Sequence, residues 1–145
     1  MVTLTGRRSL DSLEMSRLVG EAIHRVNRSL FGTAYSRHRR MRMAVLAVQE
    51  FSYHQEIHTH LLIGIPPGGR NCKAHQPSAD FASLMVSTWC GLDHGGLPPG
   101  QDVRPIFDLN GASKYITKTI YSTSQLDYVD VNNCNIPLID AAAPV

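Results

Sequence analysis

Long hydrophobic runs are missing from this sequence of 145 residues. No apolar stretch approaches the roughly 20 residues that a membrane-spanning helix needs. The N-terminal segment Met1–Thr5 is too short and too polar to serve as a secretory signal peptide. We therefore expect a protein that has no membrane partner.

Cysteine is scarce as well. The chain has three cysteines, an odd number at irregular spacing, which does not suggest a disulfide framework. A chain without such a framework fits a reducing compartment, so the expected location is the cytoplasm. A Gly-x-x-x-x-Gly-Lys phosphate-binding loop is also missing, and we expect no helicase segment within this sequence.

The composition is that of one folded domain. Hydrophobic residues make up 43% of the chain and charged residues 18%, which is enough apolar material for a core and too little charge for disorder. No linker or internal repeat divides the sequence. We expect a single domain over residues 1–145, with a poorly defined tail from about residue 122.

Acidic residues are rare in the first third of the chain. Residues 1–42 hold nine arginines and three acidic residues, a net charge of +6, while the rest carries five basic and nine acidic side chains, a net charge of −4. Guanidinium groups match phosphate geometry, so the arginines favour a nucleic-acid surface. A solvated turn between two elements is an equally good interpretation of the densest run, 37–42.

Apolar periodicity predicts the order strand, helix, strand, strand, helix, strand, helix. The first helix is expected to begin at a Ser9 cap and to stop at Gly32, and the third to begin at Asn110 or Asp108. The expected strands are 2–5, 43–51, 56–65 and 103–107, and the expected helices are 10–31, 78–90 and 112–121. Segments 129–131 and 136–139 are candidates for a further strand.

This order predicts an α+β fold with a central antiparallel sheet of about five strands, flanked by helices in a ferredoxin-like or RRM-like arrangement. The strands 43–51 and 56–65 are separated by a short turn, which predicts an antiparallel hairpin. Pro105 lies within the strand 103–107 and predicts an edge position or a bulge there.

Two histidines stand two residues apart at the start of an apolar strand. Alternate residues of a strand share a face, so His58 and His60 point to the same side. Two imidazoles side by side are half of a metal site, although such a pair is more often simply a surface feature. In the hairpin, Glu50 comes within reach of both and could complete the set.

Tyr115 and Lys118 are three residues apart on the last predicted helix and are expected to share a face. A free tyrosine is a poor nucleophile at neutral pH because the pKa of a phenol is about 10. A nearby ammonium group or metal ion would ease its ionisation. Alone, this pair is a weak signal, since most such pairs lie on a helix surface.

Taken together, these features resemble the HUH endonucleases, in particular the rolling-circle replication initiator (Rep) proteins with a single catalytic tyrosine. Three motifs stand in the family's order: Val2–Thr5 on the first strand, His58-Thr59-His60 on the third, and Tyr115–Lys118, which follows Asp108–Ala112. Thr59 departs from the pattern, because the family has a bulky hydrophobe between the histidines.

The resemblance covers residues 2 to about 121 and implies a divalent metal site. His58 and His60 would bind Mn²⁺ or Mg²⁺, and a third ligand from the preceding strand matches Glu50. Glu56 competes for this place because it shares a face with the histidines. Oxygen ligands suit Mg²⁺, whereas two histidines and a carboxylate also suit Mn²⁺.

The resemblance further implies that Tyr115 attacks a phosphodiester of single-stranded DNA, at a replication origin or hairpin, and forms a covalent 5′-phosphotyrosine, aided by Lys118. A plasmid or phage origin for the chain would fit, with a host helicase as partner. The basic residues expected to track the DNA backbone are Arg7, Arg8, Arg37, Arg39, Arg40 and Arg42.

Two other interpretations stay open. Within the superfamily, transposases and relaxases share the histidine motif, although the position of Tyr115 after the histidines fits initiators or transposases better. Alternatively, the chain is a non-catalytic nucleic-acid-binding module. Its loops would then be held by structural zinc on Cys72, His75, Cys90 and His94, which have suitable spacing.

Overall fold

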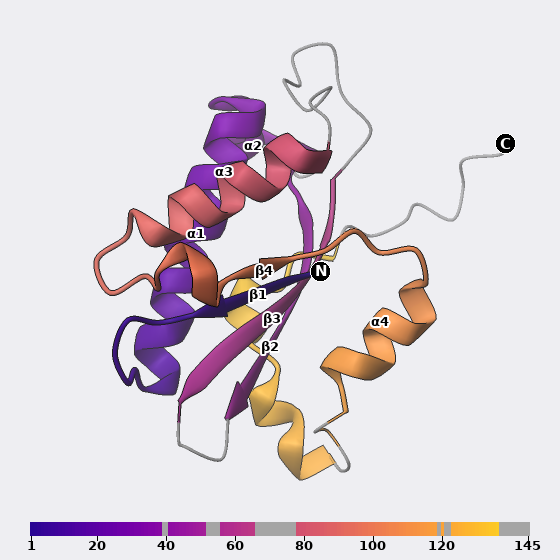
Figure 1. Cartoon of the computed structure of the whole chain (residues 1–145). Helices are drawn as coiled ribbons and strands as arrows, with labels where there is room; N and C mark the ends of the chain where they lie inside the picture. Colours follow the sequence, from indigo (N-terminus) through magenta and orange to yellow (C-terminus); the bar gives the residue numbers. More distant parts are fainter. Residues whose placement is uncertain (39–40, 52–55, 66–77, 119, 121–122, 137–145) are drawn as a thin grey trace, which may run out of the picture.

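The computed structural model describes residues 1–38, 41–51, 56–65, 78–118, 120 and 123–136. An antiparallel sheet of four strands, in the order β2-β3-β1-β4, forms the centre of the α+β fold (Figure 1). Its strands are β1 (Val2–Thr5), β2 (Ala44–Phe51), β3 (Ile57–Gly64) and β4 (Asp102–Val103).

The strand register decides which side chains meet on each face of the sheet. β2 and β3 pair as the predicted hairpin, with Glu50 opposite His58, and β1 pairs with β3 so that Thr3 lies opposite His60. Side chains directly opposite in an antiparallel ladder lie on the same face. Glu50, His58, His60 and Thr3 are therefore neighbours on one face.

The helices divide between the two faces of the sheet (Figure 1). Helices α1 (Ser12–Phe31), α2 (Ala34–Arg37) and α3 (Ser78–Cys90) lie on one side, and α4 (Leu109–Ile116) lies on the other. Short 3₁₀ helices span Pro98–Gly100, Thr123–Tyr128 and Val131–Asn133. The face with the two histidines is the one that α4 partly covers.

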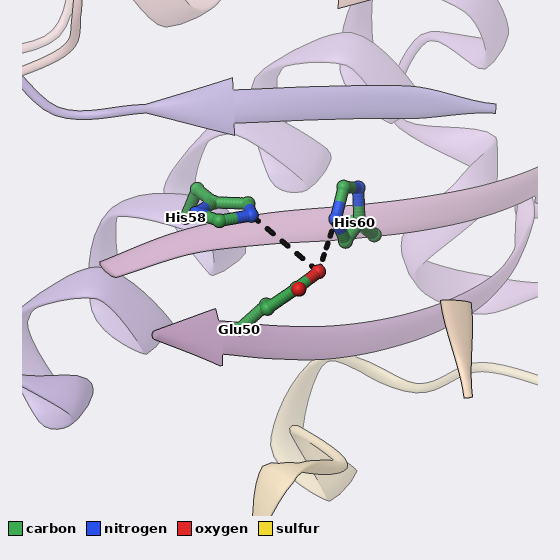
Figure 2. Close-up of side chains that lie close together, drawn as sticks. All are labelled: Glu50, His58 and His60. Atoms are coloured by element: carbon green, nitrogen blue, oxygen red, sulfur yellow. Dashed lines mark hydrogen bonds and ion pairs between the residues drawn. The ribbon is translucent and has the colours of Figure 1, made fainter. Parts of the chain in front are cut away.

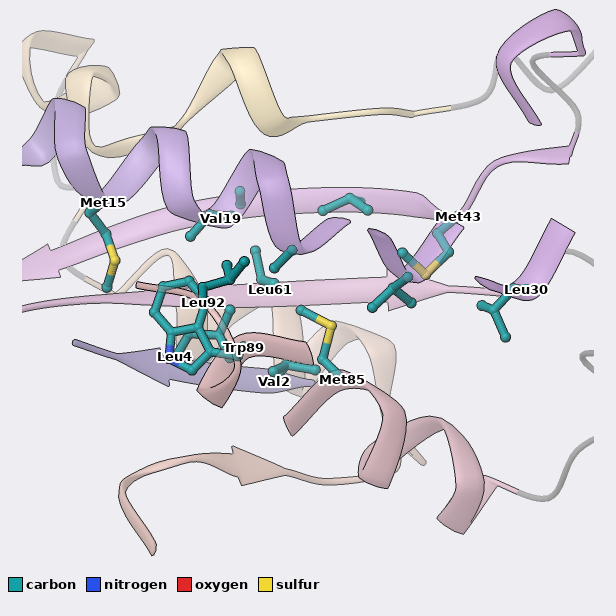
Figure 3. Close-up of a cluster of buried hydrophobic side chains, with 14 of the residues drawn as sticks. Val2, Leu4, Met15, Val19, Leu30, Met43, Leu61, Met85, Trp89 and Leu92 are labelled. Carbon is teal, nitrogen blue, oxygen red and sulfur yellow. The ribbon is translucent and has the colours of Figure 1, made fainter. Parts of the chain in front are cut away.

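Most of the apolar core fills the space between the sheet and the helices α1 and α3. Buried side chains from all these elements meet there (Figure 3), among them Leu4, Val19, Leu61, Met85 and Trp89. A second, smaller cluster on the opposite face joins Val48, Leu62 and Ile116. This smaller cluster holds α4 against the sheet beside the histidines.

The first helix begins two residues later than expected from a Ser9 cap. Asp11 is the N-cap: its carboxylate accepts a hydrogen bond of 2.7 Å from the Glu14 amide, and the Glu14 carboxylate accepts one of 3.2 Å from the Asp11 amide. This reciprocal capping box satisfies two free amides, which Ser9 does not do. The predicted stop at Gly32 is confirmed, where φ is 63°.

The last helix is shorter than the predicted 112–121. It ends at Ile116, and the Thr117 hydroxyl donates a hydrogen bond of 2.8 Å to the Ser113 carbonyl. β-Branched residues follow Tyr115 closely, and they lose side-chain freedom in a helix. Lys118 consequently lies in the turn after α4, where its amide donates to the Tyr115 carbonyl over 3.3 Å.

The predicted strand 103–107 shrinks to the two-residue β4 at the sheet edge, an edge position that Pro105 indicated. A fifth strand is not found among the described residues. Instead, Val129 and Asn135 form isolated bridges to Val48 and Val45 of β2. The predicted turn 52–55 and most of the segment 136–139 lie outside the described residues.

Candidate metal centre and active site

Glu50, His58 and His60 form a cluster that could hold a metal ion, with one ligand atom from each within 4.8 Å of the others (Figure 2). The Glu50 Oε2 atom lies 2.9 Å from His60 Nε2 and 3.5 Å from His58 Nε2. The hairpin register creates the cluster, because it sets Glu50 opposite His58 on the same face.

The spacing of these donors suits a first-row divalent ion. Two ligands that are each about 2.1 Å from one ion lie roughly 3.0–3.4 Å apart in octahedral or tetrahedral geometry. The two distances from the Glu50 oxygen to the imidazole nitrogens, 2.9 and 3.5 Å, lie just outside the two ends of this range, so small shifts would fit an ion. Neutral imidazoles with a carboxylate are a donor set that Mn²⁺ accepts more readily than Mg²⁺ does.

His60 is the most buried ligand, with 4% of its side chain exposed, compared with 19% for His58 and 17% for Glu50. Burial lowers the pKa of His60, and the nearby His58 and Lys118 add to this, although the hydrogen bond with Glu50 opposes it. His60 is therefore held neutral, which is the state that binds metal.

The two carboxylate oxygens of Glu50 contact different partners. While Oε2 faces the histidines, Oε1 lies 3.2 Å from the Lys118 ammonium nitrogen. Burial alone would raise the pKa of Glu50, but hydrogen bonds from Lys118 and His60 and the nearby positive charge lower it. The carboxylate thus stays ionised and joins the hairpin to the turn after α4.

Tyr115 stands over this cluster from α4. Its ring lies edge-on to the His60 ring at a centroid distance of 5.5 Å, and the Lys118 nitrogen is 4.4 Å from the Tyr115 ring centroid. Its exposed fraction is 46%. A solvent-accessible phenol, an ammonium group and a set of metal ligands therefore meet at one place.

No family model, curated protein or solved structure matches this chain. The candidate site therefore rests on its own geometry. That geometry brings together the five residues predicted to carry the chemistry: Glu50, His58, His60, Tyr115 and Lys118. Glu56, the competing ligand, is exposed and lies outside the cluster.

The arginines expected to track DNA are dispersed. Arg7 and Arg8 line a pocket of about 120 Å³ together with Glu56 and His58, so they border the site. Arg8 is paired with Glu14 at 2.9 Å, and Arg7 donates to the Cys90 carbonyl over 3.2 Å.

Arg37 and Arg42 lie elsewhere, at the end of α2 and just before β2, whereas Glu50 lies near the end of β2. Arg42 donates hydrogen bonds to the carbonyls of Tyr35 and Ser36, so it has a structural role in attaching α2. Arg37 is exposed, and Arg39 and Arg40 lie outside the described residues. These arginines stay a prediction for DNA contact.

The possible zinc ligands Cys72 and His75 also lie outside the described residues. Cys90 packs against the main core, where burial raises the pKa of its thiol. His94 has a positive φ of 67° and lies 3.5 Å from the Asp93 carboxylate. The zinc site therefore stays a prediction, since only two of its four ligands are among the described residues.

The sequence did not predict one neighbour of the candidate site, Thr3. The Thr3 hydroxyl lies 3.0 Å from His60 Nδ1, on the face opposite the main core. Only the pairing of β1 with β3 reveals this contact, and no local motif encodes that register.

Among the described residues, no helix is long and apolar enough to span a bilayer.

Proposed function

We propose that this protein is a metal-dependent endonuclease that nicks and rejoins single-stranded DNA through a covalent tyrosine intermediate, as a Rep-like HUH protein would to initiate rolling-circle replication. The observation that carries the proposal is the meeting of Tyr115 and Lys118 with Glu50, His58 and His60. The resemblance predicted this same set from three separate stretches of sequence.

The ligands would be His58 Nε2, His60 Nε2 and Glu50 Oε2, with Mn²⁺ favoured over Mg²⁺ by the two nitrogens. When bound, the ion would supply a positive charge that polarises a phosphodiester and stabilises the leaving oxygen. Three protein ligands leave further coordination positions open, as a catalytic rather than a structural site requires.

Tyr115 would act as the nucleophile. Its Oη would form a bond to phosphorus while the bond from phosphorus to the 3′ oxygen breaks, which leaves a 5′-phosphotyrosine and a free 3′-OH. The phenolic proton would leave to water, to which the side chain is open, and the departing 3′ oxygen would take up a proton. Attack by a 3′-OH on the phosphotyrosine would reverse the steps and rejoin the strand.

Lys118 would serve as a fixed cation and not as a base. Partial burial alone would lower its pKa, but the hydrogen bond and the attraction to Glu50 raise it above the ordinary value of a lysine. The ammonium group therefore keeps its proton at neutral pH. From its place beside the Tyr115 ring it would stabilise the developing phenolate and attract the phosphate.

The fold supports the same proposal. The strand order β2-β3-β1-β4, with helices α1 and α3 on one face, is the arrangement expected of a ferredoxin-like domain. The opposite face carries the site beside α4, and Tyr115 is 46% exposed there, so a single strand could reach its hydroxyl. Arg7 and Arg8 line the pocket beside His58 and would contact the backbone phosphates of the strand.

A denaturing gel with labelled single-stranded oligonucleotides tests the proposal. We expect a protein–DNA adduct that requires Mn²⁺, disappears with a chelator and disappears in Tyr115→Phe. Tyr128→Phe is the matched control, because Tyr128 packs beside Phe51 and against the smaller core cluster, and its hydroxyl has no part in the proposed chemistry. Adduct formation by Tyr115→Phe would refute the assigned nucleophile. Binding without any adduct across a random oligonucleotide pool would favour a non-catalytic module instead.

A further inference from the structure

We propose that Thr3 is a positioning residue for the metal centre: its hydroxyl orients the buried His60 imidazole and accepts a hydrogen bond from Nδ1–H once Nε2 exchanges its hydrogen bond to Glu50 for a bond to the ion. This inference rests on the proposed metal site but requires no DNA chemistry. It gives a specific role to Thr3 in the first-strand segment Val2–Thr5.

The contact follows from the strand register. Thr3 pairs with His60 across β1 and β3, and its Oγ1 lies 3.0 Å from His60 Nδ1. The other ring nitrogen, Nε2, lies 2.9 Å from Glu50 Oε2 and faces the cluster. Each nitrogen of His60 thus has one assigned partner. At 3% exposure the residue has little access to water that could replace Thr3.

The chemistry depends on what each nitrogen can do. A neutral imidazole has one N–H donor and one lone pair, so the partner of Nδ1 determines the state of Nε2. When the Thr3 hydroxyl accepts a hydrogen bond from Nδ1–H, the Nε2 lone pair is free for a metal. A valine in place of Thr3 has the same shape but leaves a buried Nδ1–H without an acceptor, which penalises this tautomer.

Thr5 shows that a neighbouring threonine does not have this role. It pairs with His58 in the same register, but its hydroxyl donates to the Gly100 carbonyl over 3.1 Å and lies 3.0 Å from the Gln101 side-chain nitrogen. Its hydroxyl therefore serves the loop before β4. Among the described residues, Thr3 is the hydroxyl that contacts a histidine of the cluster.

Calorimetric titration of the protein with Mn²⁺, in the absence of DNA, tests the proposal. Loss of an outer partner of a histidine ligand typically costs 10–100-fold in metal affinity, so we expect Thr3→Val to weaken Mn²⁺ binding by about that factor. Thr3→Ser keeps the hydroxyl and should restore most of the affinity. A general loss of packing would weaken both variants alike.

Thr59→Val is the matched control. Thr59 lies between the histidines on the same strand, but its buried hydroxyl has no hydrogen-bond partner among the described residues. Replacing the Thr59 hydroxyl by a methyl group should leave Mn²⁺ affinity within about twofold of the wild type. Equal affinities for wild type, Thr3→Val and Thr59→Val would overturn the proposal.

A second measurement does not depend on any variant. Nitrogen-15 NMR of the wild-type protein with saturating Mg²⁺, a diamagnetic substitute for Mn²⁺, reports which His60 nitrogen carries the proton. We expect Nδ1 to be protonated and Nε2 to be unprotonated, and the reverse assignment would refute the role of Thr3. Failure of the nuclease proposal looks different: Mn²⁺ binds as described, but no covalent adduct forms.

Discussion

The two histidines of the cluster are the same residue type in different surroundings. His60 is nearly buried and contacts Thr3, Glu50 and Tyr115, whereas His58 is partly open and borders the pocket lined by Arg7 and Arg8. His58 is the second residue of β3, whereas His60 lies further along the strand, where the Tyr115 ring packs against it. In the proposed metal site, His60 would therefore be the rigid anchor, and His58 would face the side of the pocket lined by Arg7 and Arg8.

The buried state of His60 gives the metal-free protein a defined pH dependence. Its pKa is lowered in the folded state, so between the ordinary histidine pKa of about 6.5 and the lower folded value the unfolded chain binds more protons. The contribution of His60 to stability is complete above pH 6.5 and is lost as the pH falls through this window. Urea unfolding in a chelator at pH 8 and pH 5.5 should show the decrease.

The variant His60→Gln isolates this effect, because glutamine keeps polar contacts to Thr3 and Glu50 but does not titrate. Its free energy of unfolding should fall less than that of the wild type between the same two pH values. Glu50 does not interfere in this window, because its pKa is lowered from an already acidic value. An equal decrease in both proteins would contradict the assignment to His60.

At the scale of elements, the long periodic segments were predictable and the short ones were not. α1 and the β2–β3 hairpin bury continuous apolar faces, so hydrophobic spacing alone located them. β4 and α4 are short and are fixed by tertiary contacts, which leave little local signal. Within the described part of the chain no fifth strand forms, because the segment 129–135 makes isolated bridges between 3₁₀ turns.

The same reasoning applies to the candidate site. The pair His58 and His60 was visible in the sequence because a strand places alternate residues together, and the hairpin then brought Glu50 to them. The contact with Thr3 depends on pairing across 57 residues, which no periodicity reports. Lys118 was expected on the helix face beside Tyr115, but it meets Tyr115 from the turn after α4.

Helix α4 is a separate element that carries the proposed nucleophile, and its eight residues are too few to be stable without packing. Ile116, 2% exposed, attaches it to Val48 and Leu62 of the sheet. We expect Ile116→Ala to cost about 2–5 kcal/mol of stability and to lower the nicking rate at least tenfold, because Tyr115 loses its fixed position.

The metal affinity of Ile116→Ala should stay within about twofold of the wild type, since all three ligands lie on the hairpin. Calorimetry with Mn²⁺ and a single-turnover nicking assay separate the two effects. Leu109→Ala is the control in the same helix: Leu109 is 65% exposed, so its loss should change stability by less than about 0.5 kcal/mol. Equal loss of nicking in both variants would show that docking of α4 is not what positions Tyr115.

At the scale of the whole molecule, the main core and the candidate site lie on opposite faces of the sheet. One face, with α1 and α3, holds the main core, and the other carries the metal ligands under a short helix. A metal ion that joins β2 to β3 binds only the folded chain, because the unfolded chain does not hold Glu50 near the histidines. Metal binding should therefore stabilise the entire domain and not only the site.

Thermal unfolding measures this coupling. At a Mn²⁺ concentration 100-fold above its Kd, the gain is about 2.7 kcal/mol, which raises the Tm of a domain of this size by roughly 5–10 °C. Glu50→Gln should lose most of the increase, whereas Glu56→Gln should keep it, because Glu56 is exposed and outside the cluster. The opposite result would assign the third ligand to Glu56. A Tm increase that survives in the double variant His58→Ala/His60→Ala would place the ion elsewhere, with Cys90 and His94 as the next ligands to replace.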